Sequence, residues 1–408
     1  MDILPILATL KRHKTAAGLI VLQVALTCAI VCNALFLISQ RIERINEPNG
    51  MAESEIVMLN LSGLSRSQDP DATTRGDLEV LRRLPGVKSV TVINQLPYAD
   101  NFNASSIRVK PEPLGVGEKS ISAANYFGSE GWLQTMGLNL VAGRDFTVDE
   151  YLSLTDAEKA TSPVIPAIII NRALADRLFP NIDAVGQSVY VFGTTPTRVV
   201  GVVERLVSPQ PGGTNSSQIY SMVFPVRPHF RGGSYLLRAE PAQRDAVLNA
   251  AVEAMMVVDG QRIVREKVRF SDLRAKYYQQ DVNMAWLLGG VCLALLAVTA
   301  FGIVGLASFW VQQRTRMIGT RRAMGATRGQ ILRYFQTENF LLTTAGIVLG
   351  MVAAYGISLL LMRSYELPRL PLFYLPVGAV VLWLLGQIAV RSPAQRAASM
   401  PPVAALRA

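Results

Sequence analysis

Residues 314–338 read RTRMIGTRRAMGATRGQILRYFQTE, and this basic segment decides the fold because long apolar runs enclose it. It holds six arginines, and its first acidic residue is Glu338. Val282–Gln313 precedes it, Asn339–Met362 follows it, and neither run contains a charged residue. A short cationic loop between two membrane-length runs is typical of the cytoplasmic side of a bilayer. The sequence therefore predicts a membrane protein with this loop inside the cell.

Two further uncharged runs, Thr15–Gln40 and Leu370–Val390, are also long enough to span a bilayer, which takes about 20 helical residues. The stretch Leu206–Val226 is uncharged too, but its prolines and glycines predict a loop. We therefore expect a membrane protein with four transmembrane α-helices, and a large mixed α/β domain between the first and second span.

The net charge of +10 is distributed unevenly. Residues 41–281 carry 26 Lys and Arg against 27 Asp and Glu, a net of −1, so the rest of the chain contributes +11. Those basic residues lie beside the apolar runs. Their position excludes a nucleic-acid partner and indicates a lipid bilayer. Because basic loops stay in the cytoplasm, we expect both termini inside and the α/β domain outside.

The expected organisation follows the chain in order. It comprises an amphipathic cytoplasmic segment (1–14), a first span (15–40), the α/β domain (41–270), a stalk plus second span (271–313), a cytoplasmic hairpin (314–338), a third span (339–362), a short outer loop (363–369), a fourth span (370–390) and a cytoplasmic tail (391–408). For residues 1–14, an amphipathic helix on the inner leaflet and a disordered basic end remain equally open.

Alternating patterns outside the membrane predict strands and helices that pair across the sequence. Strands are expected at Ile56–Leu61, Val87–Ile93, Ala167–Ile170, Ser188–Phe192, Arg198–Val203 and Ser234–Arg238, and helices at Asp77–Leu84, Arg172–Leu178 and Ala242–Val258.

The second span is unusually long. Its uncharged run has 32 residues, or ~48 Å as a helix, against about 30 Å of hydrocarbon. No proline interrupts residues 272–313. We expect one continuous helix, capped by Ser271 and favoured by Asp272 at its positive end, that leaves the membrane as a stalk. The alternative is a break at Gly289-Gly290.

Small residues predict close helix packing or a dimer contact. Gly346 and Gly350 form a GxxxG pattern, and Gly302 and Gly305 provide a similar face in the second span. No charged residue lies within any uncharged run, which speaks against an ion or proton relay.

Catalytic chemistry is not expected. The sequence contains no GxxxxGK[ST] phosphate-binding loop, and its two histidines, His13 and His229, fall in opposite predicted compartments. No catalytic residue, metal or cofactor is therefore predicted on this chain.

The basic segment itself predicts a helical hairpin. Gly325 suits the left-handed position that ends a helix, and Thr327 with Gln330 forms a capping box that starts the next one. Residues expected to be exposed are Arg314, Arg316, Arg321, Arg322 and Arg328. Anchoring to anionic lipid and docking of a protein remain equally open from the residues alone.

The hairpin resembles the signature RxREIGIRRALGATRxxI, followed by a Glu, of MacB/FtsX-type ABC transporter permeases. Matching residues are Arg314, Arg316, Ile318, Gly319, Arg321, Arg322, Ala323, Gly325, Ala326, Thr327, Arg328, Ile331 and Glu338. The tail from Pro393 is similar to that family's C-terminus, and residues 126–146 and 169–187 resemble its MacB-like periplasmic core.

The resemblance implies a permease of the bacterial inner membrane that pairs as a dimer and binds an ATPase through the hairpin. The ATPase would carry ATP and magnesium, and a periplasmic adaptor and outer-membrane channel are further expected partners. Export or extraction of a substrate is the favoured function. The alternatives are an FtsX-like relay to a partner such as a cell-wall hydrolase, and a scaffold or sensor. Met317 and Thr320 depart from the signature, which favours a heterodimer with a second, more typical permease.

Overall fold

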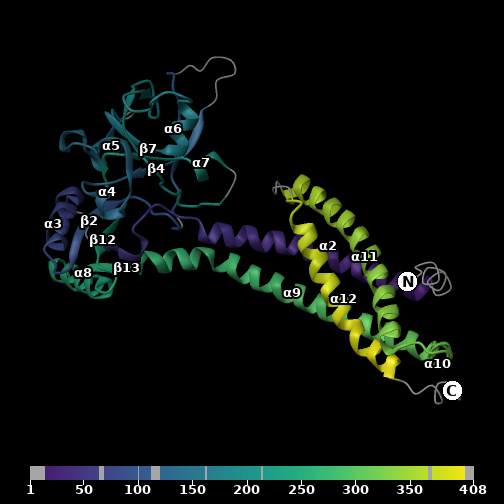
Figure 1. Ribbon diagram of the computed structural model, residues 1–408. Helices are drawn as coiled ribbons and strands as arrows, with labels where there is room; N and C mark the ends of the chain where they lie inside the picture. The colour runs from purple at the N-terminus through teal and green to yellow at the C-terminus, as the bar shows by residue number, and fades with distance from the viewer. Residues whose placement is uncertain are drawn as a thin grey trace. The chain divides into compact units, whose positions relative to one another are not determined.

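The computed structural model describes residues 14–63, 69–99, 101–111, 120–160, 163–212, 215–365 and 370–399 (Figure 1). The chain divides into a helical unit, Met1–Asn46 with Gln280–Ala408, and an α/β unit, Glu47–Gln279. The predictions for the N-terminal segment up to residue 13, for the outer loop at 366–369 and for the tail beyond residue 399 lie outside the described residues.

Four described helices are long and apolar enough to cross a membrane, which confirms the four predicted spans. They are α2 (Lys14–Asn46), α9 (Phe270–Gln313), α11 (Arg328–Tyr365) and α12 (Tyr374–Ser399). A short helix, α10 (Thr315–Ala323), lies between α9 and α11. The helix α11 packs against both α2 and α12, and Figure 1 shows α11 and α12 side by side. Their shared core is formed by apolar residues of α2, α9, α11 and α12.

Helix α9 is continuous over 44 residues, which is about 66 Å at 1.5 Å per residue. The continuous helix is confirmed, and the alternative break at Gly289-Gly290 is wrong. The predicted cap is also wrong, because the preceding strand ends at Arg269 and the helix starts directly at Phe270. Ser271 therefore lies in the first turn, where its hydroxyl donates to Asp272.

The small residues of α11 allow it to approach α2 closely. A Cβ added to Gly346 would lie 2.7 Å from the Val24 Cβ, and one added to Gly350 would lie 2.5 Å from the Cys28 Cβ. Gly302 of α9 meets the Gln23 side chain at 2.5 Å in the same construction. Gly305 has no such neighbour within 4 Å among the described residues. Three of the four predicted packing glycines thus contact another helix of the same chain.

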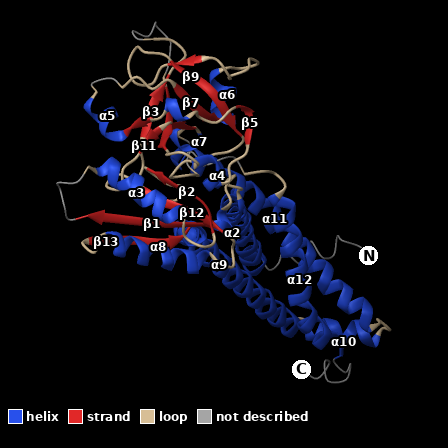
Figure 2. Cartoon of the chain, turned by 90° about the vertical axis from the view of Figure 1, so that its left-hand side faces the viewer, coloured by secondary structure: helices blue, strands red, loops and turns tan. Residues whose placement is uncertain are grey.

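One sheet of the α/β unit has four antiparallel strands in the order β13-β1-β12-β2 (Figure 2). These strands are β1 (Ile56–Gly63), β2 (Val87–Ile93), β12 (Ser234–Ala239) and β13 (Arg262–Arg269). Helices α3 (Pro70–Arg82) and α8 (Arg244–Val258) pack against the sheet and build a core with it. The strand β13 is an edge strand and leads directly into α9.

The second sheet is mixed and has the order β3-β4-β10-β7-β9-β5, with β8 paired to β9. Its strands are β3 (Ala104–Ile107), β4 (Ile121–Phe127), β5 (Leu140–Gly143), β7 (Ala167–Asn171), β8 (Ser188–Val189), β9 (Thr197–Val203) and β10 (Ser221–Phe224). A two-stranded sheet joins β6 (Leu152–Ser153) to β11 (Val226–Arg227). Short helices complete the unit: α4 (Trp132–Met136), α5 (Leu154–Lys159), α6 (Arg172–Leu178) and α7 (Ser216–Ile219).

The predicted mixed α/β domain between the first two spans is confirmed, and its pairing joins distant segments such as β1 and β12. The loop predicted over Leu206–Val226 is wrong in its second half, where Ser216–Ile219 forms the short helix α7 and a strand follows. Ser221–Phe224 forms β10, which pairs with β4 and β7 inside the sheet and is fully buried. The prolines and glycines at the start of that stretch led to a loop prediction for all of it, although a short apolar strand lies at its end.

Candidate functional site

The basic hairpin consists of α10, the turn that follows it and the first turns of α11. Gly325 has φ of +97°, and its N–H donates to the Arg322 carbonyl at 3.1 Å. The next N–H, of Ala326, donates to the Arg321 carbonyl at 3.0 Å. This pair of bonds is the Schellman arrangement that ends a helix with a left-handed residue. The predicted helix end at Gly325 is confirmed.

The predicted capping box is also present. The Thr327 N–H donates to Gln330 Oε1 at 2.9 Å, and the Gln330 N–H donates to Thr327 Oγ1 at 3.3 Å. These bonds satisfy donors that a helix start otherwise leaves free. The turn between α10 and α11 is therefore defined from both sides by local hydrogen bonds.

Arg314 is buried, so its predicted exposure is wrong. Its Nη1 donates to both carboxylate oxygens of Glu338, at 3.0 and 2.8 Å, and Glu338 is only 1% exposed. The Arg314 guanidinium also lies 5.7 Å from the Trp310 ring centroid. A buried charge without a partner costs several kcal/mol. The one acid of the segment, Glu338, is therefore buried together with Arg314. The pair joins the end of α9 to α11.

An apolar cluster supports the hairpin. It contains residues of α9, α10 and α11 together with the end of α12: Val311, Ile318, Ile331, Phe335, Ala394, Ala397 and Ala398. Gly319 is buried beside Ile318, and the Arg322 Nη1 donates to the Ala398 carbonyl at 3.0 Å. Sequence reasoning separated this tail from the hairpin and so missed its role. The alanines at i, i+3 and i+4 were a usable signal for a packed helical face.

The surface of the hairpin is both basic and apolar. Arg316 and Arg328 are exposed, and the Met324 side chain at the turn is 75% exposed. Arg321 is half-buried, with its guanidinium 5.0 Å from the Tyr334 ring centroid. The only acid of the described hairpin is already paired with Arg314. Such a face is suited to binding an acidic or mixed surface, because exposed cations lie beside an exposed apolar side chain.

The first turns of α9 are anchored within the α/β unit by an aromatic cluster. The Tyr98 ring lies 5.4–5.7 Å from the rings of Phe270, Tyr277 and Tyr278, and burial raises the pKa of Tyr98 and Tyr278. Tyr98 has a φ of 67°, which is strained for a residue with a bulky side chain.

An ion pair accompanies this aromatic cluster. Arg274 lies against the cluster, 5.7 Å from the Tyr98 ring centroid. Its Nη1 donates to Glu53 at 2.5 Å, and its Nη2 donates to the Glu47 carbonyl at 2.7 Å. The first two turns of α9 are thus fixed to two separate segments of the α/β unit.

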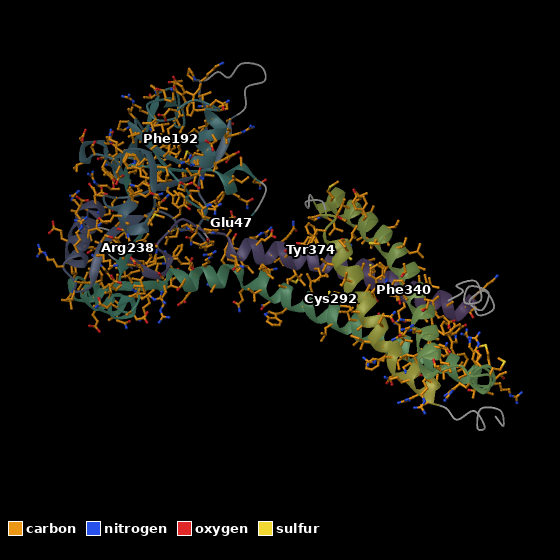
Figure 3. The ribbon with its side chains drawn as sticks, viewed as in Figure 1. Glu47, Phe192, Arg238, Cys292, Phe340 and Tyr374 are labelled. Atoms are coloured by element: carbon orange, nitrogen blue, oxygen red, sulfur yellow. The ribbon has the colours of Figure 1, made fainter. Side chains whose placement is uncertain are left out.

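Within the helical unit, α9 is also attached to α2. The Arg41 guanidinium pairs with the Asp281 carboxylate, and the Thr27 and Thr299 hydroxyls are 2.8 Å apart. Together with the Arg314–Glu338 pair, these contacts fix both ends of the apolar part of α9. Figure 3 labels Cys292 in this part, and Cys292 packs against Val31 and Ala34 of α2.

The motif residues 137–146 of the α/β unit make contacts that stabilise a turn. Gly143 has φ of +75°, and a Cβ there would lie 2.1 Å from the Val200 carbonyl oxygen. Arg144 pairs with Glu150 at 2.6 Å and lowers the pKa of that carboxyl to about 2. Phe146 packs between the rings of Trp132 and Tyr151. The motif therefore closes the turn after β5.

Comparisons with known proteins agree with this architecture. The profile of the MacB-like periplasmic core domain matches residues 20–255, more than half of the chain, and that of the FtsX-like permease C-terminal domain matches residues 289–402. The uncharacterized ABC transporter permease YknZ of Bacillus subtilis is 25% identical over 344 residues, 82% of this chain and 79% of that protein. The macrolide export ATP-binding/permease protein MacB of Nitrosomonas europaea is 26% identical over 410 residues, 97% of this chain and 57% of that protein.

The chain thus spans little more than half the length of that MacB relative. Among solved structures, the periplasmic region of MacB from Actinobacillus actinomycetemcomitans aligns with a TM-score of 0.34 at 17% identity, covering 57% of this chain and 96% of that structure. With two family profiles matched in order and four described helices that can span a membrane, the chain belongs to the MacB/FtsX family of ABC transporter permeases, as a multi-pass membrane protein with a MacB-like periplasmic domain.

Proposed function

We propose that this chain is the non-catalytic membrane subunit that couples ATP hydrolysis to movement of its periplasmic domain, and so drives export or extraction of a substrate. ATP and magnesium would bind to an ATPase that this sequence does not contain. The observation that carries the proposal is the continuous helix α9, which runs from Phe270 in the α/β unit to Gln313 beside the hairpin. A displacement of the hairpin would be passed along this one helix to the periplasmic domain.

The proposed orientation places the hairpin and both termini in the cytoplasm of a bacterium and the chain in its inner membrane. Outside residues 41–281, 12 of the 14 Lys and Arg residues lie in the N-terminal segment, the hairpin and the tail, and only Arg363 and Arg369 lie on the other side, which supports this orientation. Labelling single cysteines at Arg316 and at Glu240 with a membrane-impermeant reagent in spheroplasts tests it. Labelling should occur at position 240 and not at position 316, and the reverse pattern would refute the orientation.

The exposed hairpin residues are the proposed docking surface for the ATPase. Replacing Arg316 and Arg328 by Glu reverses two exposed charges and should abolish co-purification of the ATPase. Arg321 and Arg322 are poorer targets, because they contact Tyr334 and the Ala398 carbonyl and their loss would disturb the hairpin itself. Arg391→Glu, an exposed charge reversal on α12, is the matched control and should retain the ATPase. Unchanged co-purification of the double variant would refute docking at this surface.

A second permease is the other proposed partner, with a heterodimer favoured and a homodimer as the alternative. Exposed apolar side chains of α9, including Leu293, Val298 and Phe301, and the open Gly305 support a helix–helix contact on this face. Met317 and Thr320, which depart from the family signature, support division of labour between two permeases. If this chain and its ATPase alone form a stable, active two-plus-two complex, the heterodimer is excluded.

A further inference from the structure

A small groove lies between α11 and α12 at the hairpin end of the helical unit. It has a volume of about 210 Å³ and is lined by Arg333, Gln336, Thr337 and Phe340 of α11 and by Gln387 of α12. The two helices are joined here, since the Gln387 amide donates to the Gln336 carbonyl at 3.4 Å. The groove is therefore set between two membrane helices, and Arg333 is the one cation among the residues that line it.

Arg333 differs from three other arginines of residues 314–338, each of which makes a contact within the fold. Arg314 pairs with Glu338, Arg321 lies on the Tyr334 ring, and Arg322 binds the Ala398 carbonyl. The exposed Arg333 guanidinium has no acceptor or ion-pair partner within the part of the chain that the structure describes. Five donors of one planar group thus remain available at the groove.

The groove lies at the level where the apolar runs begin. Arg333 precedes the uncharged run from Asn339 by six residues, or ~9 Å of helix, and Gln387 lies near the end of the run that closes at Val390. On the apolar side, the Phe340 ring stacks on Trp383 with centroids 5.7 Å apart, and Figure 3 labels Phe340 in the helical unit. Trp is one of the two residue types enriched at the membrane–water interface.

We propose that this groove binds the phosphate group of an anionic glycerophospholipid. The Arg333 fork would bind the phosphate oxygens, the amides of Gln336 and Gln387 would meet the polar headgroup, and the acyl chains would pass the exposed side chains of Phe340 and Leu384. A lipid is the source of phosphate that fits, because the cation and an exposed apolar surface meet at the groove. Lipid binding at this groove would require neither the ATPase nor the substrate.

Native mass spectrometry of the full chain released from nanodiscs tests the site, with phosphatidylglycerol and phosphatidylcholine as probes. The wild type should retain phosphatidylglycerol in preference to phosphatidylcholine. R333Q should lower that retention by about fiftyfold, because it removes both charge-assisted hydrogen bonds and general attraction. R328Q alters an exposed arginine on the same helix that does not line the groove, and it should lower retention by about fivefold at most.

Another variant, a folding control and a competing anion test the site further. R333K retains the charge and should recover part of the retention, which separates ligand binding from misfolding, and gel filtration of each variant reports folding directly. Equal losses in R333Q and R328Q would reduce the effect to general charge attraction and overturn the site. Displacement of the lipid by millimolar inorganic phosphate would assign the groove to a free anion instead. Equal retention of phosphatidylcholine would overturn the proposal as well.

Discussion

The two ends of α9 are held by different chemistry. Within the α/β unit, the first turns pack with Tyr98 in an aromatic cluster edged by the Arg274–Glu53 pair. Within the helical unit, the last turn lies beside the buried Arg314–Glu338 pair and the apolar cluster that includes Ile318. The Arg274–Glu53 pair is partly exposed and tolerates small shifts, because water can solvate the separated charges. A buried ion pair does not, because separation leaves charges unpaired in a dry environment.

The hairpin end of α9 is therefore the more strictly positioned one. If this end moves, the paired helices α9 and α11 have to move together. The aromatic end has room to adjust its packing while remaining attached.

Breaking the buried pair should cost most. Arg314→Met leaves the Glu338 carboxylate buried and unpaired, and should destabilise the helical unit by about 3–5 kcal/mol. Thermal unfolding of the purified protein in nanodiscs measures the loss. The control is the double variant Arg314→Met/Glu338→Leu, which removes both charges and should recover most of the stability. A single variant as stable as the wild type would show that the pair does not fix the hairpin.

Interrupting α9 between its two attachments comes next. Gln280→Pro removes a helical hydrogen bond at an exposed position outside the apolar run and should cost about 3 kcal/mol of helix stability. We expect the ATPase to remain bound while its hydrolysis no longer changes protease accessibility of the periplasmic domain. Gln280→Ala should behave as the wild type. A proline variant that still couples would contradict transmission through α9.

The packing glycines separate contacts inside the chain from open positions. Gly350→Ala places a Cβ 2.5 Å from the Cys28 Cβ and should destabilise the helical unit by about 1–3 kcal/mol through overpacking. Gly356→Ala, on the same helix, meets no atom within 4 Å among the described residues. It should leave thermal stability unchanged or raise it slightly, and equal losses in the two variants would contradict close packing of α11 on α2 at Gly350.

The smallest effect concerns alkaline pH at the aromatic end. Burial raises the pKa of Tyr278 above its usual value of 10, so its contribution to stability is complete below pH 10 and is lost as pH rises above that value. Tyr278→Phe cannot ionise and should shift alkaline unfolding of the α/β unit to higher pH. Tyrosinate absorbance against pH measures the transition. Tyr220→Phe, a tyrosine outside the cluster, is the control and should shift it less.

The spans, the continuous α9 and the hairpin turn could be predicted because each depends on residues close together in sequence. Uncharged runs define the spans, and Gly325 and Thr327 act on their immediate neighbours. Arg314 could not be placed in the same way. Its burial depends on Glu338, one helix further on, and on an apolar cluster completed by the end of α12. The charge of Arg314 alone predicted a surface position, whereas its pairing with Glu338 places it in the interior.

The α/β unit shows the same limit. Strands such as Val87–Ile93 were predicted with their observed bounds, but the order of strands in the sheets depends on pairings between distant segments. Ser221–Phe224 became an interior strand because β4 and β7 flank it. No pattern within four residues contains that information.

Arg269 ends β13 and Phe270 begins α9, so no residue of loop separates strand from helix. A flexible linker has many backbone conformations and could take up a rotation of the helix without passing it to the strand. A rotation of α9 would therefore act directly on β13, whose register against β1 shifts at Asn60/Leu61, as well as on the contacts of α9 with Tyr98 and Glu53. Under the proposed coupling, the edge strand β13 would receive this displacement first, and we expect its backbone amides to exchange before those of the other strands in the sheet.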